Sequence, residues 1–171
     1  MDFDQLTTQR QSVRNFQPKN VENEKINQIL SLLNRAPSAG NLQAFCVYVI
    51  TEPSKRAALA KAALNQEFIA QAPLDLVFCA VPERSEPRYG NRGAALYSIQ
   101  DATIACTFAM LAATELGLGS VWVGAFDEKK VAKVIDAPEQ FRPVTILPIG
   151  YSAEIPQRRP RRKLDDIVYW D

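Results

Sequence analysis

The stretch from residue 94 to residue 116 is apolar on nearly every side, and it constrains the fold more than any other segment. Its periodicity predicts the longest helix of the chain, roughly 35 Å at about 1.5 Å per residue. Leu96, Ile99 and Cys106 mark one face, while Ile104 and Phe108 belong to the rest of the surface. A helix of this kind has to be covered on several sides, so it predicts the central helix of a layered fold.

Helices and apolar strands alternate along the rest of the chain. The strand segments are apolar on both faces, which indicates a sheet covered by helices on each side. Prolines and glycines predict that residues 82–93 form a long loop with the character of a mobile flap. The expected strands are residues 45–50, 74–81, 118–123 and 144–149, and the expected helices are residues 4–10, 21–33, 53–64, 67–71 and 127–135.

Residues 1–171 have the length of one domain, and residues 151–171 differ from the body in composition. We expect this segment to be an arm that ends in a strand-like apolar run, Ile167–Trp170. The body has little surface left to bury that run, so we expect it to lie against a second copy of the chain. The alternative is a tail that folds back onto its own chain.

The charge balance and the missing histidines exclude several function classes. The net charge is +1, which is too balanced for a protein whose main partner is nucleic acid or an anionic membrane. No histidine is present, which excludes Ser-His-Asp and Cys-His nucleophiles and histidine-based zinc sites, and we expect no bound metal. Three cysteines far apart, no apolar leader and polar residues within the long apolar helix predict a soluble cytoplasmic protein.

Two groups of cations stand at opposite ends of the sequence. Arg10 and Arg14 flank Ser12, and five cations fall within residues 158–163. Guanidinium groups and a serine hydroxyl are donors that hold phosphate, so the two groups predict a phosphate clamp if the fold joins the chain ends. The alternative is that the C-terminal run is solvated surface. Residues 117–122 carry two glycines of a dinucleotide fingerprint, but a helix rather than a strand precedes them, which excludes a Rossmann site.

Several segments, taken in order, carry the signatures of one family. Residues 10–16, Arg-Gln-Ser-Val-Arg-Asn-Phe, resemble the R-x-S-x-R-x-F opening of the flavin-dependent nitroreductase family, and residues 36–43 look like its APSxxNxQ loop. The resemblance covers essentially the whole chain. Further segments similar to the family in order and spacing are Asn65–Ile69 with Ala72-Pro73, Gln100–Ala102, Gly117–Ser120, Leu147–Tyr151 and Arg159–Arg161.

The resemblance implies an α+β fold, a three-layer α/β/α sandwich with a mixed, mostly antiparallel sheet. It further implies a homodimer with exchanged C-terminal arms and two FMN molecules at the dimer interface. Carried over by position, the FMN contacts fall into four groups. The phosphate and ribityl end would meet Arg10, Gln11, Ser12 and Arg14 together with Arg159 and Arg161. The ring would meet Pro37, Ser38, Ala39 and Asn41 of the partner subunit, and the ribityl chain or ring edge would meet Asn65 or Gln66. Along the ring would run the backbone N–H groups of Trp122, Val123, Gly124 and Ala125.

Other roles remain open for some of these residues. Arg14 can instead lie beside the N1–O2 edge of the flavin, where a cation stabilises negative charge. Pro37 can shape a turn, Asn65 can cap a helix and Trp122 can belong to the core.

The resemblance also implies FMN-dependent oxidation of NAD(P)H. The flavin carries the chemistry, so we expect no catalytic side chain. We expect a ping-pong reaction in which NAD(P)H and then a nitroaromatic, quinone or similar small electrophile use the same site. The alternatives are another flavin reaction of the family, such as reductive dehalogenation or flavin destruction, and a flavin-binding sensor or regulatory module without turnover.

Overall fold

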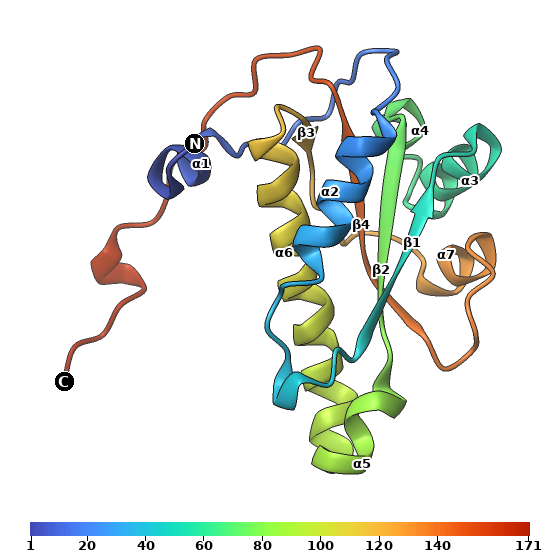
Figure 1. Cartoon of the computed structure of the whole chain (residues 1–171), viewed down its shortest axis with the longest axis vertical. Helices are drawn as coiled ribbons and strands as arrows, with labels where there is room; N and C mark the ends of the chain where they lie inside the picture. The colour runs from blue at the N-terminus through green and yellow to red at the C-terminus, as the bar shows by residue number, and fades with distance from the viewer.

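The computed structural model describes residues 1–171 and consists of a four-stranded sheet between two layers of helices (Figure 1). Neighbouring strands are all antiparallel, and Ser12 adds a parallel bridge to Ser120 at the edge. This arrangement confirms the α+β sandwich with a mostly antiparallel sheet. The strands, in the spatial order β1-β2-β4-β3, are β1 (Phe45–Ile50), β2 (Leu74–Ala80), β3 (Gly119–Ser120) and β4 (Arg142–Gly150).

The sheet has a hydrophobic core on each face. β2 pairs on both sides and is buried along its whole length. Its side chains alternate, so that Leu76 and Phe78 pack toward one helical layer while Val77 and Cys79 pack toward the other. One layer is α2 (Asn23–Leu33) with α6 (Ser98–Glu115), and the other is α3 (Pro53–Ala62), α4 (Phe68–Gln71) and α7 (Glu128–Val134).

Two helices begin at an aspartate side chain that caps them. The Asp127 carboxylate accepts a hydrogen bond from Lys130 N at 3.1 Å and caps α7 as predicted. Asp2 caps the first helix, α1 (Phe3–Gln9), by accepting from Gln5 N at 2.8 Å. Contacts this local help to place both helices from the sequence.

The prediction of a loop at residues 82–93 is wrong. The segment forms α5 (Pro82–Arg92), followed by a π-helical turn η2 (Gly93–Tyr97), and α6 therefore begins later than expected. Pro82 lies in the first turn, where its missing N–H breaks no helical bond. Gly90 adopts φ 57° and ψ −150°, which kinks the helix without ending it.

Arg84 attaches α5 to the sheet. Its Nη1 donates to Gln43 O at 2.9 Å and to Phe45 O at 2.7 Å. These hydrogen bonds join residues about forty positions apart in the sequence. Tertiary contacts of this kind override the low helix propensity of Pro87 and Gly90, and the local sequence does not show them.

The helical run Pro82–Glu115 is long and apolar enough, by length and composition alone, to cross a membrane. The kink at Gly90 interrupts it, and its second part, α6, packs against α2, β2 and β4. Ala102, Ala105 and Ala109 of α6 are fully buried. The run therefore contains the central core helix that the sequence predicts.

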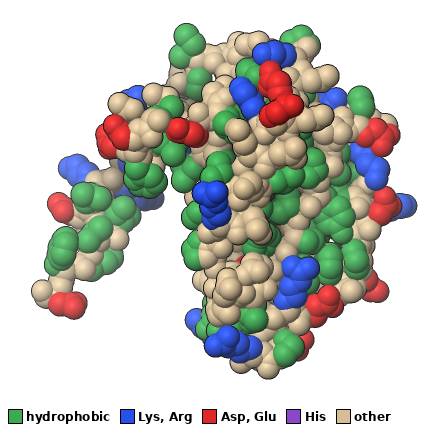
Figure 2. Space-filling model, in the orientation of Figure 1, with side chains coloured by type: hydrophobic (Ala, Val, Ile, Leu, Met, Phe, Trp, Pro, Cys, Tyr) green, Lys and Arg blue, Asp and Glu red, His purple; other side chains and the backbone are tan.

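The prediction of a strand at Ile167–Trp170 is wrong in the single chain. These residues follow a 3₁₀ turn η3 (Leu164–Asp166) and pair with no strand. The tail extends away from the body beyond α1 and presents hydrophobic side chains to solvent (Figures 1 and 2). Tyr169 is 88% exposed and Trp170 is 91% exposed. A strand needs a neighbouring strand to satisfy its backbone, and this chain places none beside the tail.

Candidate functional site

Residues 10–17 run as an extended segment along the short strand β3. Val13 N donates to Ser120 O at 3.0 Å. Gly119 allows this close approach, because a Cβ atom at position 119 would lie 2.7 Å from Val13 Cγ2. The contact fixes the N-terminal segment at the edge of the sheet.

The same segment also pairs with the start of the arm, which we define as residues 151–171. Gln17 N donates to Tyr151 O at 2.8 Å. Further along, Arg14 N donates to Glu154 Oε1 at 2.6 Å. The arm is therefore carried back across residues 10–14, and the two ends of the chain meet.

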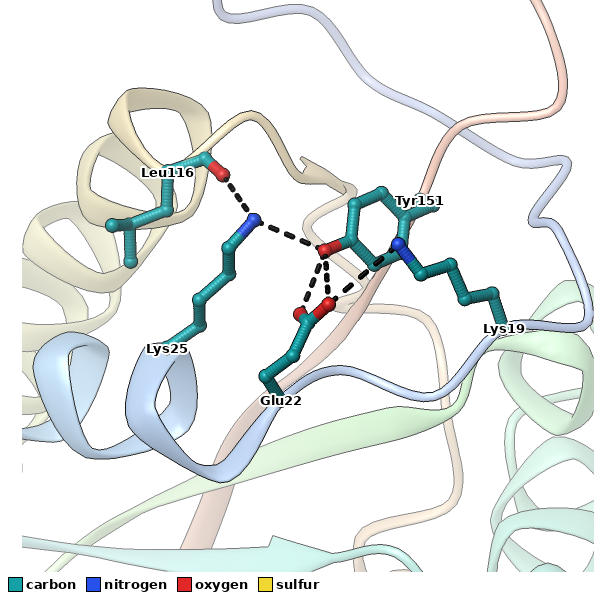
Figure 3. Close-up of polar contacts among 5 residues, drawn as sticks. All are labelled: Lys19, Glu22, Lys25, Leu116 and Tyr151. Atoms are coloured by element: carbon teal, nitrogen blue, oxygen red, sulfur yellow. Dashed lines mark hydrogen bonds and ion pairs between the residues drawn. The ribbon is translucent and has the colours of Figure 1, made fainter.

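A group of polar side chains, the Tyr151 cluster (Lys19, Glu22, Lys25 and Tyr151), fixes the point at which the arm leaves β4 (Figure 3). Tyr151 Oη donates to Glu22 Oε2 at 2.6 Å and accepts from Lys25 Nζ at 3.0 Å. Lys25 Nζ also donates to Leu116 O at 2.9 Å, just beyond α6. The hydrogen bond from Tyr151 lowers the pKa of Glu22 and keeps that carboxylate ionised. The cluster joins α2, α6 and β4.

A cavity of about 500 Å³ opens where the two ends of the chain meet. No hydrophobic residue lines it. We call it the arm cavity. Its walls come from the N-terminal segment and the arm, and they consist of Arg10, Gln11, Ser12, Arg14, Glu154, Pro156, Gln157, Arg159 and Arg161.

The chain does not neutralise the positive charge of the arm cavity. None of its four arginines forms an ion pair, and its one carboxylate, Glu154, accepts a backbone N–H. Partial burial, and then the nearby charge of Arg161, lower the pKa of Arg10. Guanidinium groups held this close favour an anion between them.

The structure brings Arg10, Ser12 and Arg14 together with two cations of the C-terminal run, Arg159 and Arg161. Three other cations of the C-terminal run, Arg158, Arg162 and Lys163, do not line the cavity. The sequence analysis missed Glu154, Pro156 and Gln157, because no motif marks them. The one signal available was their position just before the basic run. The residues predicted from sequence that line the arm cavity are Arg10, Gln11, Ser12, Arg14, Arg159 and Arg161.

The loop at residues 37–41 lies at the opposite end of α6 and is anchored by a buried carboxylate. Asp101, in the first turn of α6 and 2% exposed, accepts hydrogen bonds from Ala39 N at 2.9 Å and from Ala44 N at 3.2 Å. Sequence analysis gave Asp101 no role of its own. The signal that it missed was a carboxylate in the first half of a helix that is expected to be covered on several sides.

The backbone of this loop is held by further internal contacts. Ser38 Oγ accepts from Gln43 N at 3.0 Å. Gly40 and Asn41 adopt left-handed φ values of 57° and 58°, which glycine and asparagine tolerate. None of Pro37, Ser38, Ala39 and Asn41 lines the arm cavity.

Two other predicted contact segments touch each other. Gln66 Nε2 donates to Ala125 O at 2.9 Å. Asn65, next to it, does not cap a helix but adopts a left-handed φ of 59° in the turn after α3. This pairing places residues 65–66 beside residues 122–125, as an FMN site built from both requires.

The backbone of residues 122–125 departs in part from expectation. Only two residues of the expected strand 118–123 pair as β3, and Val123 forms an isolated bridge to Ile146. Val123 N donates to Ile146 O at 2.9 Å, so the expectation that this N–H faces a flavin ring does not hold. Within residues 122–125, the backbone N–H groups of Trp122, Gly124 and Ala125 have no partner in the chain.

The loop and the arm cavity are too far apart in one chain to surround one small cofactor. Asp101 holds the loop near the start of α6, and the helix rises roughly 21 Å between Asp101 and Glu115. In Figure 1 the arm passes α1 and β3 at one end of α6, while α5 lies at the other end. Arg88 of α5 reaches the loop there, with Nη1 3.4 Å from Gly40 O. One chain therefore presents the loop and the arm cavity as two separate regions.

The residues of the arm cavity fit the phosphate end of FMN. Guanidinium forks and a hydroxyl match phosphate oxygens in geometry and charge. The cavity lacks the apolar walls that a flavin ring needs, so the ring has to lie beyond it. The unpartnered N–H groups of residues 122, 124 and 125 are donors suited to the polar edge of such a ring.

Known proteins similar to this chain include FMN reductases and nitroreductases. The model of the nitroreductase family matches residues 7–83 and 60–151. The chain is 28% identical over 167 residues to FMN reductase (NAD(P)H) of Bacillus subtilis, covering 90% of this chain and 67% of that protein. It is 26% identical over 172 residues to oxygen-insensitive NADPH nitroreductase of Salmonella typhimurium, covering 96% and 72%. The crystal structure of a nitroreductase family protein from Clostridium difficile superposes with a TM-score of 0.87 at 33% identity, covering 100% of this chain and 99% of that one.

Proposed function

The chain belongs to the nitroreductase family, and from this premise we propose that it is an FMN-dependent NAD(P)H oxidoreductase whose arm cavity holds the FMN phosphate. The observation that carries this proposal is the arm cavity, where the fold gathers Ser12 and four arginines. None of these arginines has an ion-pair partner. Similarity to proteins named FMN reductase and NADPH nitroreductase supports the same cofactor and electron donor.

The residues of the chain divide the binding of FMN between them. The guanidinium groups of Arg10, Arg14 and Arg161 and the hydroxyl of Ser12 would bind the phosphate, and Gln11 and Arg159 would complete the wall. The backbone N–H groups of residues 122, 124 and 125 would orient the ring, in a segment held by the hydrogen bond from Gln66 to Ala125. When bound, FMN supplies two-electron transfer between NAD(P)H and an acceptor. No side chain has to act as nucleophile or base, which suits a chain without histidine.

We propose that the working unit is a homodimer in which the loop at residues 37–41 of one subunit completes the FMN site of the other. The loop is fully anchored by its own chain, yet no cofactor site of that chain lies beside it. The exposed Tyr169 and Trp170 supply apolar surface for the arm to bind the body of the second subunit. In this arrangement residues 1–171 form one domain, with the arm embracing the partner.

Within that site we propose that NAD(P)H and a small nitroaromatic or quinone bind in turn. Similarity to an oxygen-insensitive NADPH nitroreductase supports the nitroaromatic acceptor. We also propose a cytoplasmic location, because all three cysteines are free and a reducing compartment keeps them so.

The absorbance spectrum of the purified full-length protein tests the cofactor and the donor together. We expect a flavin spectrum that is bleached by NADH or NADPH without oxygen and restored by menadione or a nitroaromatic. Steady-state oxidation of NAD(P)H should give parallel double-reciprocal lines as the acceptor concentration is varied. A protein that stays colourless with added FMN contradicts the proposal, and bound flavin without turnover identifies a sensor instead.

Deleting residues 164–171 tests the dimer. The deletion removes the apolar end of the arm but none of the residues that line the arm cavity. We expect sedimentation to change from a dimer to a monomer, accompanied by weaker FMN binding, whereas Asp171→Asn, at the exposed end of the arm, should remain dimeric. A full-length protein that sediments as a monomer with tightly bound FMN would refute the shared site.

A further inference from the structure

β1 and β2 place two of the three cysteines directly opposite each other. Cys46 of β1 is the register partner of Cys79 of β2. Both side chains pack into the core on the side of α3 and α7. Directly opposed residues in antiparallel strands have Cα atoms about 4.5–5.5 Å apart, which lies within the range of about 4.4–6.8 Å that a disulfide spans. The strand register alone therefore brings the two sulfurs within reach of a bond.

Forming that bond requires a small movement of β1. Val81 N donates to Ala44 O at 2.9 Å, and because hydrogen-bonded pairs alternate along an antiparallel ladder, Cys46 and Cys79 form the next such pair. Side chains of directly opposed pairs stand somewhat further apart than a disulfide prefers. β1 has a strand neighbour on one side only, so it can move. A disulfide that forms under this strain is readily reduced again.

The two thiols differ in access and in acidity. Cys46 is partly exposed, whereas Cys79 is fully buried. A hydrogen bond from the Cys79 thiol, and then the nearby charge of Arg84, lower the pKa of Cys46. The bond to Cys46 and burial raise the pKa of Cys79. Because the thiolate is the reactive form, Cys46 is suited to react first with an oxidant and Cys79 to react second with Cys46.

We propose that Cys46 and Cys79 are a peroxide-sensitive pair that closes reversibly to a disulfide between β1 and β2. The Cys46 thiolate attacks hydrogen peroxide, the O–O bond breaks, and a sulfenic acid and hydroxide form. The Cys79 thiol then attacks the sulfenic sulfur and its proton passes to the leaving hydroxyl group, so that an S–S bond forms and the S–O bond breaks with release of water. In sum, two thiols and one peroxide give one disulfide and two waters, with two electrons passing from sulfur to oxygen. This site lies apart from the arm cavity and does not depend on the proposed function.

Cys106 provides an internal control. It is fully buried in α6 and packs into the core on the opposite face of the sheet. Burial raises its pKa, and the pKa of Cys79 is raised as well, but Cys106 faces no second cysteine whose oxidised sulfur its thiol could attack. We expect Cys106 to remain reduced while the pair is oxidised.

Peptide mapping of the full-length protein tests the proposal. The protein is reduced, freed of reductant, treated with a molar excess of hydrogen peroxide, alkylated and digested with trypsin without reduction. The three cysteines fall in separate tryptic peptides, residues 36–55, 62–84 and 93–129. We expect the first two to be recovered as one linked species that dithiothreitol separates, and the third to be alkylated. Recovery of both Cys46 and Cys79 as free thiols, or of links that include Cys106 equally often, would overturn the proposal.

Two variants assign the roles of the sulfurs. Cys46→Ser should leave Cys79 reduced under the same treatment, because the accessible thiolate is gone. Cys79→Ala should let Cys46 proceed to sulfinic acid, because no thiol resolves the sulfenic acid. If Cys79→Ala does not fold, the wild-type map and Cys46→Ser still decide the matter. Oxidation of Cys79 in Cys46→Ser at the wild-type rate would contradict the proposed order.

Discussion

The arm cavity and the loop at residues 37–41 lie at opposite ends of α6 and use their polar groups in opposite ways. In the arm cavity the guanidinium groups of Arg10, Arg14, Arg159 and Arg161 have no ion-pair partner. In the loop, the N–H of Ala39 and the hydroxyl of Ser38 are both engaged by the loop's own chain. The arm cavity leaves its guanidinium groups free of ion pairs, whereas the loop uses a backbone donor, Ala39 N, and a hydroxyl acceptor, Ser38 Oγ, to hold its own conformation.

This difference shows how one short chain can serve two sites. A cavity with uncompensated charge gains by binding an anion, so its own ligand stabilises it. A loop whose backbone is already satisfied is preorganised, and it presents a fixed surface to whatever lies next to it. In the proposed dimer, the first region would bind the FMN phosphate, and the second would complete the FMN site of the other subunit.

The largest expected effect comes from removing charge from the arm cavity. Arg10→Ala combined with Arg161→Ala should weaken FMN binding by about 100-fold or more, because each arginine contributes charged hydrogen bonds to phosphate. Riboflavin, which lacks the phosphate, should bind to the variant and to the wild type equally well, as measured by fluorescence quenching. Arg158→Ala combined with Arg162→Ala is the matched control, because neither residue lines the cavity. An equal loss in the control would show that general charge, rather than the cavity, binds FMN.

Asp101→Ala should disrupt the loop and leave the arm cavity intact. Two backbone N–H groups, of Ala39 and Ala44, lose their acceptor, and we expect the free energy of unfolding to fall by about 2–4 kcal/mol. Urea unfolding measures the loss. Asp101→Asn keeps one acceptor oxygen and should lose roughly half as much. A variant as stable as the wild type would mean that the loop is held by other contacts.

A buried carboxylate in the sheet, outside both regions, makes the stability of the fold depend on pH. Asp75 in β2 is fully buried and its oxygens have no hydrogen-bond partner. Burial raises its pKa well above the ordinary value, an effect that the charge of Arg56 opposes. The folded state therefore retains a proton that the unfolded chain loses near pH 4, so stability falls as the pH rises above that value, by at most about 1.4 kcal/mol per pH unit.

Asp75→Asn should flatten this dependence and raise stability at neutral pH. Urea unfolding of the variant and the wild type from pH 4 to pH 8 measures it. Parallel curves for the two proteins would show that Asp75 keeps the same pKa in the folded and unfolded states.

The smallest expected effect concerns the Tyr151 cluster. Tyr151→Phe removes the hydrogen bonds to Glu22 and from Lys25 that direct the arm, and we expect FMN affinity to fall by about five-fold, in line with roughly 1 kcal/mol. Tyr97→Phe is the matched control, since it removes a hydrogen bond from Arg92 beside the other end of α6. FMN titration compares the two. A larger loss of FMN affinity in Tyr97→Phe than in Tyr151→Phe would show that the region at the start of α6, rather than the arm, controls FMN binding.

The sequence could predict what local patterns and the family signature determine. The apolar segments of β1, β2 and β4 and the cap of α7 at Asp127 were found because burial and capping act within a few residues. The arginines around Ser12 and those of the arm could be grouped because the signature places both at one phosphate.

The rest depends on contacts between distant parts of the chain. α5 was taken for a loop because its prolines are visible in the sequence, whereas the bonds from Arg84 to Gln43 and Phe45 are not. The role of Asp101 and the engaged N–H of Val123 likewise follow from partners far away in the sequence. The strand expected at Ile167–Trp170 has no partner strand in the single chain.

The pairing of residues 10–17 with the start of the arm has a consequence for biosynthesis. Translation produces Arg10 and Arg14 long before Glu154, Arg159 and Arg161. The sheet and the helices between them can form while translation continues, but the walls of the arm cavity meet only after residue 161 has left the exit tunnel. A nascent chain that stops short of the arm can therefore fold its body and still lack the proposed phosphate site.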